Sequence, residues 1–462
     1  MSLLTSAYRA ELSALLSRSA ATPVHLSKGG TLPGRQRLVE KAFSHYDSAS
    51  SLYVSEDRSV ATYTPMRIKG SKAELAFDER QMESLFGCCP MRFAQISIGP
   101  HPDFRDLDFN ATADYYCVSM FVDMVGSTKL VTLGYTLLEI RRIKDTILSL
   151  FIQVANFFGG HVHRLQGDAA FIQFVRVGCE ASDCAINALN AASLISYFVT
   201  HFFAEQFREN GLDPIAVRVG LDYGDADQVL WSHYGLPGCS ELTTTSTYTD
   251  LAAKLQAKAG HNEIRLGNNL RELLDLPTEF IKLPLTDGKL DQYILPELMY
   301  QQHEFDWRAY LASFDFATLD SRTKRLVINS DPNRFRLQCD VYTEAFDYTK
   351  HEGKYTQNTF ALPKGKGLIF RILENQHTYQ RRSLHVVTWQ IENRGKEAES
   401  DPNKSWKNPE RDTTATPELR TGTSLKGHHY MRCCIQRPGQ PDLNLRLPVF
   451  VREGNTSQML MD

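Results

Sequence analysis

The chain has 462 residues, of which 42% are hydrophobic and 23% are charged, as is ordinary for a globular protein. Its 51 lysines and arginines face 54 acidic residues, and the formal net charge of −3 lacks the basic excess of a general nucleic-acid binder. No segment reaches the roughly 18 consecutive apolar residues of a transmembrane helix, and no signal peptide is visible. We therefore expect a cytoplasmic protein with no membrane partner and no need of nucleic acid for its chemistry. At roughly 150 residues per domain, the length predicts about three domains.

Residues 1–112 carry no chemical motif and are predicted as an N-terminal region of mixed helices and strands. An amphipathic helix opens the chain, and a glycine pair at Gly29–Gly30 separates it from a second helical stretch near Arg35–Tyr46. Strand-like pieces follow around Val60–Ile68. We assign no role to this region.

Residues 113–300 have the clearest periodicity. Tyr115–Val125 is rich in β-branched and aromatic residues and is predicted as a buried strand. Apolar residues then recur at steps of three and four between Leu137 and Val154, as on one face of a helix that ends at Gly159–Gly160. The elements expected next are a hairpin of His161–Leu165 and Ala169–Phe174, a helix over Ala181–Asn210, a strand over Ile215–Tyr223, a helix over Thr249–Lys258, a strand over Glu263–Leu266 and a final strand pair of Phe280–Pro284 with Asp291–Leu295. This β-α-β-β-α-β order predicts a ferredoxin-like core within an α+β fold.

The pattern changes after about residue 300. We assign residues 301–325 to a linker and residues 326–462 to a separate, mostly-β sandwich. The strands expected in the sandwich are Leu326–Ile328, Arg334–Tyr342, Gly367–Glu374, Leu384–Glu392, His428–Gln436 and Leu443–Val451.

One candidate site begins at Asp123, near the end of the first buried strand of this domain. Gly126 and the small hydroxyl residues Ser127 and Thr128 follow it and lead into a helix. Free backbone N–H groups at a helix start attract phosphate oxygens, so this segment suits a metal–triphosphate site. An ordinary strand-to-helix turn with a hydroxyl N-cap has the same pattern.

A second carboxylate, Asp168, lies in the predicted turn of the hairpin. In a ferredoxin-like sheet this hairpin neighbours the strand of Asp123. Two carboxylates so placed can hold hard divalent cations, Mn²⁺ or Mg²⁺, through oxygen ligands. Two such ions can polarise an α-phosphate, activate a 3′-hydroxyl and neutralise a leaving diphosphate.

Four segments together resemble class III adenylyl and guanylyl cyclases. The first two, FVDMVGST (121–128) and RLQGDAAFIQF (164–174), look like the two metal motifs of that family. A third, AVRVGLDYGD (216–225), resembles the strand after the second helix, and TDLAAKLQ (249–256) resembles the helix that contacts ribose and phosphate. All four are in family order, and the resemblance implies a nucleotidyl cyclase that acts on a nucleoside triphosphate.

The resemblance also implies roles for individual residues. It makes Asp123 and Asp168 catalytic metal ligands. The residues that it implies in triphosphate binding are Val125, Gly126, Ser127, Thr128 and Arg218.

The base and ribose half of the site departs from the family. Arg164 stands where the family has a purine-selecting lysine, and Thr243 where it has a purine-selecting aspartate. Asp250 replaces the helix asparagine, and Lys254 replaces the transition-state arginine. Lys254 can still supply a catalytic positive charge to the α-phosphate. The role of Asp250 near a triphosphate is open, although its register makes it a substrate-side residue.

These departures predict a pyrimidine substrate. Arginine offers only hydrogen-bond donors, and uracil presents two carbonyl acceptors with one N–H between them. Cytosine carries an amino donor where uracil has O4. On these grounds UTP ranks first, with cyclic UMP as product, CTP second, and ATP or GTP behind both.

The C-terminal segments VTWQIENRGKEA (387–398) and TSLKGHHY (423–430) are similar to the adenylyl/guanylyl and SMODS C-terminal sensor domain. Any β-sandwich with a core Trp389 and a turn at Asn393–Gly395 is the alternative. With the altered base pocket, this tail resembles the pyrimidine cyclases of bacterial Pycsar anti-phage systems. That resemblance implies a second messenger that acts on a separate cyclic-nucleotide-binding effector.

Class III cyclases form their sites between two catalytic domains, so one such domain per chain predicts a homodimer with sites at its interface. A catalytically inactive nucleotide-binding sensor is the alternative, and the retention of both metal carboxylates favours an active enzyme. His161 and His163 alternate before Arg164 and are predicted as ordinary core or surface residues rather than metal ligands.

Overall fold

The computed structural model describes residues 3–17 and 76–454, apart from residues 128, 287, 321, 324, 332, 356–358, 381, 383, 402–404 and 409–416. The predictions for residues 18–75, among them Arg35–Tyr46 and Val60–Ile68, and the turn residue Thr128 lie outside the described residues. The opening helix is confirmed as α1 (Ser6–Leu16). None of the helices in the described parts has the length and apolarity that crossing a membrane requires.

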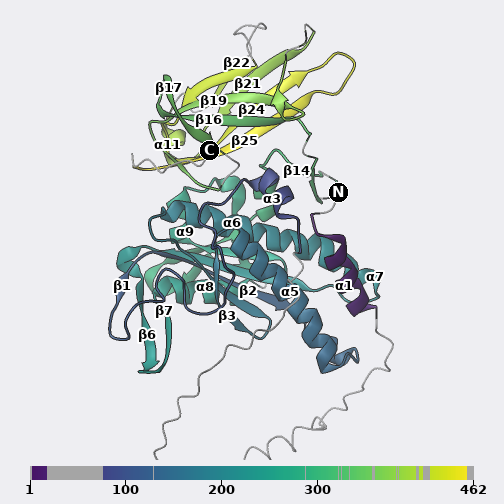
Figure 1. Ribbon diagram of the computed structural model, residues 1–462, viewed down its shortest axis with the longest axis vertical. Helices are drawn as coiled ribbons and strands as arrows, with labels where there is room; N and C mark the ends of the chain where they lie inside the picture. The colour runs from purple at the N-terminus through teal and green to yellow at the C-terminus, as the bar shows by residue number, and fades with distance from the viewer. Residues whose placement is uncertain are drawn as a thin grey trace, which may run out of the picture.

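An eight-stranded sheet occupies the middle of the molecule, and we call the domain built on it the central domain (Figure 1). Its strand order is β12-β13-β8-β5-β2-β4-β3, and β9 is a further partner of β13. The strands are β2 (Cys117–Val125), β3 (His161–Gln166), β4 (Ala169–Phe174), β5 (Ala216–Gly224), β8 (Glu263–Gly267), β9 (Ile281–Lys282), β12 (Tyr293–Leu295) and β13 (Tyr300–Phe305). The part of this order that reads β5-β2-β4-β3 is that of a ferredoxin-like core, which confirms the predicted fold.

Helices cover both faces of this sheet. Helix α5 (Leu137–Phe157) begins at a capping box formed by Thr136 and Glu139 and packs beside α6 (Ala181–Phe198) on the face that carries the buried core. The predicted second long helix is confirmed, with a π-helical turn at Val199–Phe203 before α7 (Ala204–Glu209). Helix α8 (Thr247–Lys258) lies on the opposite face, where Thr249 hydrogen-bonds Ser119 of β2 at 2.9 Å.

The end of the central domain differs from the sequence-based expectation. The segments expected to pair with each other, Phe280–Pro284 and Asp291–Leu295, supply β9 and β12, and both pair with β13 instead. The expected linker 301–325 contains most of that strand and also α10 (Trp307–Leu311). Strand β13 was missed because two of its three buried residues, Gln302 and His303, are polar; Gln302 is fully buried and donates to the carbonyl of Asp291 at 2.7 Å.

A second small sheet adjoins the central one and was not predicted. It consists of β1 (Ala113–Asp114) and the hairpin β6 (Leu230–Leu236) and β7 (Cys239–Thr245), whose tip projects from the domain (Figure 1). Trp231 anchors its base, because the indole stacks on Phe104 at 4.0 Å between ring centroids and donates to the carbonyl of Tyr115.

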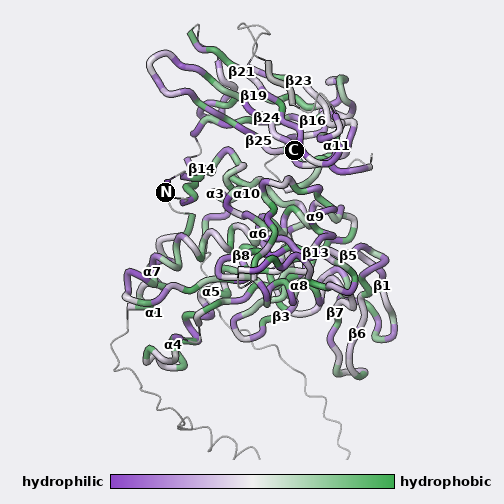
Figure 2. Tube along the Cα trace, turned by 180° about the vertical axis from the view of Figure 1, so that it is seen from behind, coloured by the Kyte–Doolittle hydropathy of each residue, from purple (hydrophilic) through white to green (hydrophobic). Residues whose placement is uncertain are grey.

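The C-terminal domain is a β-sandwich, as expected. Its two five-stranded sheets have the orders β17-β16-β19-β20, with β23 on β19, and β18-β25-β24-β21-β22. The strands are β16 (Arg336–Glu344), β17 (Asp347–Tyr355), β18 (Leu362–Pro363), β19 (Gly367–Glu374), β20 (His377–Thr378), β21 (Val386–Glu392), β22 (Ser405–Asn408), β23 (Glu418–Gly422), β24 (Gly427–Gln436) and β25 (Leu443–Arg452). Hydropathy alternates along many of these strands, as expected for strands with one face in a core (Figure 2).

One predicted sandwich strand belongs elsewhere. Leu326–Ile328 forms β15, which pairs only with β14 (Ala317–Leu319) and not with either sandwich sheet. The side chain of Leu326 joins the core of the central domain. Short apolar runs of three residues do not reveal which core they enter.

The sandwich packs tightly on the central domain. Near the start of α6, Asp183 accepts a hydrogen bond from the backbone N–H of Ala361 at 2.8 Å, and Asn187 donates to the carbonyl of Thr359 at 2.6 Å. The apolar core of the central domain also includes three sandwich residues, Ala361, Tyr430 and Phe450. The two domains therefore share buried surface rather than being joined by a free linker.

Close packing at Gly220 sets the position of α8 and gives a test of this arrangement. A Cβ atom at Gly220 would lie 2.2 Å from the backbone nitrogen of Gln256 and 2.3 Å from the carbonyl oxygen of Ala252. We expect Gly220→Ala to lower the free energy of unfolding by about 1–3 kcal/mol, measured by thermal or urea denaturation. Ala257→Ser, on the exposed side of α8, is the control. An unchanged unfolding midpoint for Gly220→Ala would contradict the close approach.

Candidate functional site

Two carboxylates meet at one end of the central sheet. Asp123 lies near the end of β2, and Asp168 lies in the turn between β3 and β4. Asp123 is paired across the ladder with Ala169, the residue that follows Asp168. The register of β2 on β4 therefore brings together the two residues that the sequence singled out.

Each carboxylate faces a side-chain cation. Arg218 of β5, which is paired across the ladder with Asp123, forms an ion pair with its carboxylate, and Gln256 of α8 lies 3.4 Å from the same Oδ2 atom. The ammonium of Lys144 lies 3.7 Å from Oδ1 of Asp168, and the Ser127 hydroxyl donates to Oδ2 of that carboxylate. The predicted residues Asp123, Asp168, Ser127 and Arg218 thus form one polar cluster.

The turn after β2 differs from the expected helix start. Val125 ends the strand, and Gly126 adopts a φ of +96°, a conformation that L side chains rarely adopt. The chain then enters a helix of only four residues, α4 (Lys129–Thr132), and the long helix α5 starts later, at Leu137. The physical reason is the turn at Gly134, with φ +84°, which lets Thr136 cap a new helix.

The donor set fits hard divalent cations bound together with a phosphate ligand. Within the described residues, no group of three or more His, Cys, Asp or Glu side chains is placed to hold a metal ion. Mg²⁺ commonly binds one or two carboxylates and completes its shell with water and substrate phosphate oxygens. Asp123 and Asp168 supply that pair of carboxylates. The side chains of Lys144 and Arg218 face them, so the site accommodates positive charge.

Arg164 is part of an ion pair that sequence reasoning missed. Its Nε atom lies 2.9 Å from Oε1 of Glu241 on β7, and its Nη2 atom bonds Oε2, so the guanidinium and carboxylate form a two-point fork. The hydrogen bond from Arg164 holds the pKa of Glu241 below its ordinary value. The only sequence signal was that Glu241 is the one acidic residue in 230–245.

Thr243, predicted to read the base, is buried in the hairpin and paired across the ladder with Ser232. No hydrogen bond joins it to Arg164 in the described part of the structure. Glu241, two residues earlier on the same strand, takes the place beside Arg164 that was expected for Thr243.

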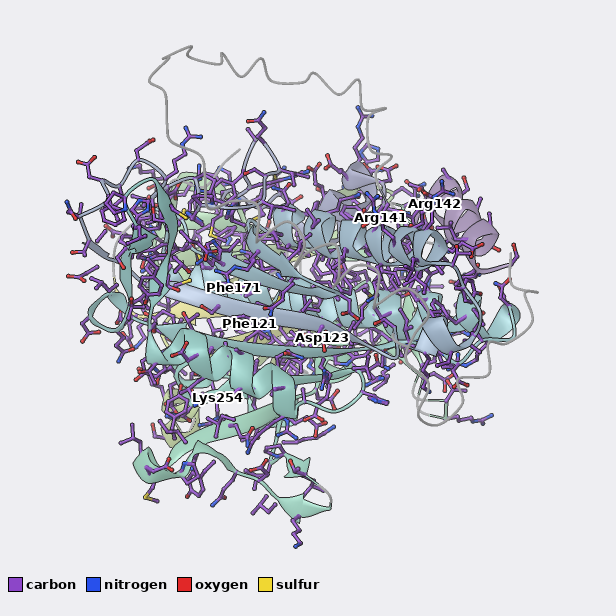
Figure 3. The ribbon with its side chains drawn as sticks, turned by 90° about the horizontal axis from the view of Figure 1, so that it is seen from below. Phe121, Asp123, Arg141, Arg142, Phe171 and Lys254 are labelled. Atoms are coloured by element: carbon purple, nitrogen blue, oxygen red, sulfur yellow. The ribbon has the colours of Figure 1, made fainter. Side chains whose placement is uncertain are left out.

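The two α8 residues lie apart from the carboxylate cluster. Asp250 and Lys254 are exposed, four residues apart on one side of the helix, and Gln256 rather than Lys254 contacts Asp123. Figure 3 shows Lys254 on α8 and Asp123 on the strand beside it. Among the described residues, no ion pair involves Asp250 or Lys254.

A stacked aromatic pair lies between these groups. The rings of Phe121 on β2 and Phe171 on β4 are 4.4 Å apart with an interplanar angle of 2°, and they are labelled side by side in Figure 3. Phe171 is paired across the ladder with Arg164, so this row of side chains shares a sheet face with Asp123. Both residues are partly buried. Part of the aromatic surface is therefore exposed beside the polar clusters.

Comparison with known proteins gives three findings. The model of the adenylyl/guanylyl and SMODS C-terminal sensor domain matches residues 317–441. A Staphylococcus aureus protein named cytidylate cyclase is 33% identical over 396 residues, which cover 84% of this chain and 88% of the relative. An Escherichia coli protein of the same name is 33% identical over 289 residues, which cover 61% of this chain and 60% of the relative.

Among solved structures, the adenylyl cyclase CyaB from P. aeruginosa is 17% identical. The match covers 46% of this chain and 98% of that one, with a TM-score of 0.34, which is too low to carry an argument. The fold assignment therefore stands on the strand order of the central sheet.

Proposed function

The chain belongs to the cytidylate cyclase family of pyrimidine nucleotidyl cyclases, and on this premise we propose that it converts CTP to 3′,5′-cyclic CMP and diphosphate. Membership of the family makes it a nucleotidyl cyclase. The choice of base, the metal ions and the biological role are our proposals.

The ion pair of Arg164 with Glu241 carries the choice of CTP. Along its pairing edge, cytosine presents an amino donor and then two adjacent acceptors, N3 and O2. Glu241 can accept from the amino group while the guanidinium fork of Arg164 donates to both acceptors. Uracil presents an acceptor, a donor and an acceptor, which one carboxylate beside one donor fork matches less completely.

UTP remains the second candidate. The sequence-based ranking that put UTP first rested on the donors of Arg164 and included no acidic partner. Glu241 beside Arg164 supplies such a partner and removes the ground for that order. The names of the two relatives described above, both cytidylate cyclases, support the new order. ATP and GTP stay behind both pyrimidines.

We propose that Asp123 and Asp168 hold two divalent cations, Mn²⁺ or Mg²⁺, together with triphosphate oxygens. Cations bound there would polarise the α-phosphate and lower the pKa of the 3′-hydroxyl. In the reaction the 3′-oxygen bonds to the α-phosphorus, the α-phosphorus bond to the diphosphate oxygen breaks, and the hydroxyl proton passes to solvent. The positive charge of Arg218, released from Asp123, then faces phosphate oxygens beside the turn of Val125, Gly126 and Ser127.

The base proposal is tested by incubating the protein separately with ATP, GTP, CTP and UTP plus Mn²⁺ and identifying products by mass. We expect cyclic CMP to dominate. Glu241→Gln removes the negative charge and replaces one accepting oxygen with an NH₂ donor, and it is expected to lower kcat/KM for CTP roughly 10- to 100-fold. Glu297→Gln, at an exposed position outside the site, is the control.

Other products would each favour a different alternative. Dominant cyclic UMP would restore the sequence-based ranking, and dominant cyclic AMP or cyclic GMP would contradict a pyrimidine substrate. A folded protein that converts none of the four would support the inactive-sensor alternative.

We also propose that two copies of the chain share each site. Lys254 and Asp250 are exposed and, among the described residues, form no ion pair with the cluster of Asp123 and Asp168. The stacked pair of Phe121 and Phe171 is partly exposed beside that cluster. In a two-fold symmetric homodimer, Lys254 of one copy can supply its charge to the α-phosphate held by the carboxylates of the other.

Sharing of sites predicts complementation. Asp123→Asn, Asp168→Asn and Lys254→Ala should each abolish or nearly abolish turnover when present in both copies. Mixing Asp168→Asn with Lys254→Ala chains and allowing exchange should recover about a quarter of wild-type activity, because half of the dimers are mixed and each has one intact site of two. No recovery in a sample whose mixed dimers are verified by native mass spectrometry would contradict shared sites.

We propose that the product is a second messenger in bacterial antiviral defence and acts on a separate cyclic-nucleotide-binding effector. A signal made continuously would harm its own cell, so synthesis needs a control, and we assign that control to the sandwich. The match of residues 317–441 to a domain described as a sensor supports this assignment. So does the buried contact of the sandwich with α6.

Glu279 offers a point at which to test control by the sandwich. It forms an ion pair with Arg394 and accepts a hydrogen bond from the Tyr430 hydroxyl at 3.1 Å, and both partners belong to the sandwich. We expect Glu279→Ala to raise the cyclic nucleotide level of uninfected cells and to change survival under phage infection. Turnover of the purified variant should change little, and Glu297→Ala is the control. Unchanged cellular levels, or a folded variant without activity in vitro, would contradict a regulatory contact.

A further inference from the structure

We propose that His163 is a positioning residue that holds Glu241 in place for reading the base. This inference rests on the proposed function, because it gives a cause for the orientation of the carboxylate that distinguishes CTP. It concerns a side chain predicted from sequence as an ordinary core or surface residue.

His163 lies where β3 departs from regular pairing. The register of β3 on β4 shifts between Val162 and Arg164, so the residue between them occupies a bulge. Its ring meets the ring of Phe171 edge to face, with 5.3 Å between centroids. The side chain is 1% exposed, while the side chains of Arg164 and Glu241 are 49% and 42% exposed. A buried ring thus adjoins an exposed ion pair.

Both ring nitrogens of His163 face fixed oxygen atoms. Nδ1 lies 3.2 Å from the carbonyl oxygen of Gly99, and Nε2 lies 3.0 Å from Oε1 of Glu241. Gly99 is itself held against β3, because its N–H donates to the carbonyl of Val162 at 3.2 Å. The ring therefore spans from an anchored backbone group to the carboxylate.

The hydrogen on Nε2 follows from the chemistry of its neighbours. The Gly99 carbonyl is also approached by Nε2 of His161 at 2.8 Å, which supplies it with a donor. The carboxylate of Glu241 accepts hydrogen bonds only. A neutral His163 ring is therefore most stable with its single hydrogen on Nε2, which lies 3.0 Å from Oε1 of Glu241. The N–H is not aligned as a full hydrogen bond, so the contact is a short electrostatic one. A protonated ring carries the same hydrogen.

This contact leaves the carboxylate pre-oriented when substrate arrives. Oε1 of Glu241 faces both His163 Nε2 and Arg164 Nε, whereas Oε2 is bonded by Arg164 alone. When Arg164 turns its donors toward a base, His163 still holds Oε1, so Oε2 stays directed at the amino group. Without that anchor the substrate would have to order a half-exposed glutamate side chain, and the lost conformational entropy would weaken the affinity for the substrate.

The test compares two replacements that keep different halves of the ring. Glutamine at this position retains a donor near Nε2, whereas asparagine places its amide near Nδ1 and leaves no donor near Nε2. We expect His163→Asn to raise KM for CTP roughly ten-fold, with kcat little changed, and to lower the CTP-over-UTP ratio of kcat/KM by a similar factor. His163→Gln should keep most of that ratio. In a Glu241→Gln background, His163→Asn should reduce the ratio no further.

His161→Asn is the matched control, because His161 contacts the same carbonyl but has no contact with Glu241. Loss of the ratio in His161→Asn as well, a wild-type ratio in folded His163→Asn, or full additivity of His163→Asn with Glu241→Gln would each overturn the proposal.

A spectroscopic measurement covers the case in which His163→Asn fails to fold. Glu241→Gln changes an exposed side chain, and histidine ¹⁵N spectra of that variant should show a shift of the His163 Nε2 resonance with His161 unmoved. An unmoved His163 resonance would overturn the proposal. A wild-type enzyme that makes no cyclic CMP, with the His163 resonance nonetheless shifted, would locate the failure in the proposed function and not in this contact.

Discussion

The register of β2 between β4 and β5 is the constraint on which the site depends. It sets Asp123 opposite Ala169 on one side and opposite Arg218 on the other, so a single strand position fixes both the second carboxylate and the compensating cation. Side chains alternate between the faces of a strand, and a slip of one residue would turn Asp123 into the core and bring Val122 or Met124 to the open face. The buried Val118, Met120 and Val122 resist that slip, because each would leave the apolar core between β2 and α6. Core packing therefore determines the geometry of the polar cluster, although no apolar residue takes part in it.

The same reasoning explains which parts of the site could be predicted from sequence. The carboxylate half is encoded locally: a strand that ends in Asp123 and a tight turn that carries Asp168 are each visible in a few consecutive residues. The partner of Arg164 is not local, since Glu241 lies 77 residues later on a different sheet and approaches only through tertiary packing. Strand β13 was missed for a related reason, because Gln302 is buried by hydrogen bonds rather than by apolarity. Periodicity finds apolar cores, and it does not find polar contacts between sheets.

The sandwich illustrates a second limit of sequence reasoning. Five of the ten strands described in it were predicted, since each alternates toward its own core. The surface by which the sandwich meets the central domain leaves no periodic signal. Asp183 and Asn187 lie among small and apolar residues of α6, and their partners are backbone groups of residues 361 and 359. A backbone group can belong to any residue type, so such a partner cannot be recognised from sequence.

This buried contact also decides which experiment is useful. Deletion of the sandwich would expose the surface of the central core that Tyr430 covers, whereas a single substitution at Glu279 leaves both cores intact.

A common electrostatic feature joins the two halves of the site. Asp123 is balanced by Arg218, Asp168 by Lys144, and Glu241 by Arg164, so each of these three carboxylates has a cationic side chain beside it. In the proposed reaction a nucleoside triphosphate and its metal ions would exchange partners with these pairs. Asp123 and Asp168 would hold the metal ions, and Arg218 and Lys144 would then be free to face phosphate oxygens. Because ion pairs are exchanged rather than newly desolvated, the electrostatic cost of occupying the site is smaller than that of burying isolated charges. The partial exposure of these pairs in one chain fits such an exchange, since solvent screens them, and in the proposed homodimer a partner surface would cover them. Such an exchange requires that the three carboxylates keep their orientation while the arginine and lysine side chains move away from them. Strand register provides that for Asp123, a tight turn provides it for Asp168, and the buried ring of His163 provides it for Glu241, which is the longest and most exposed of the three.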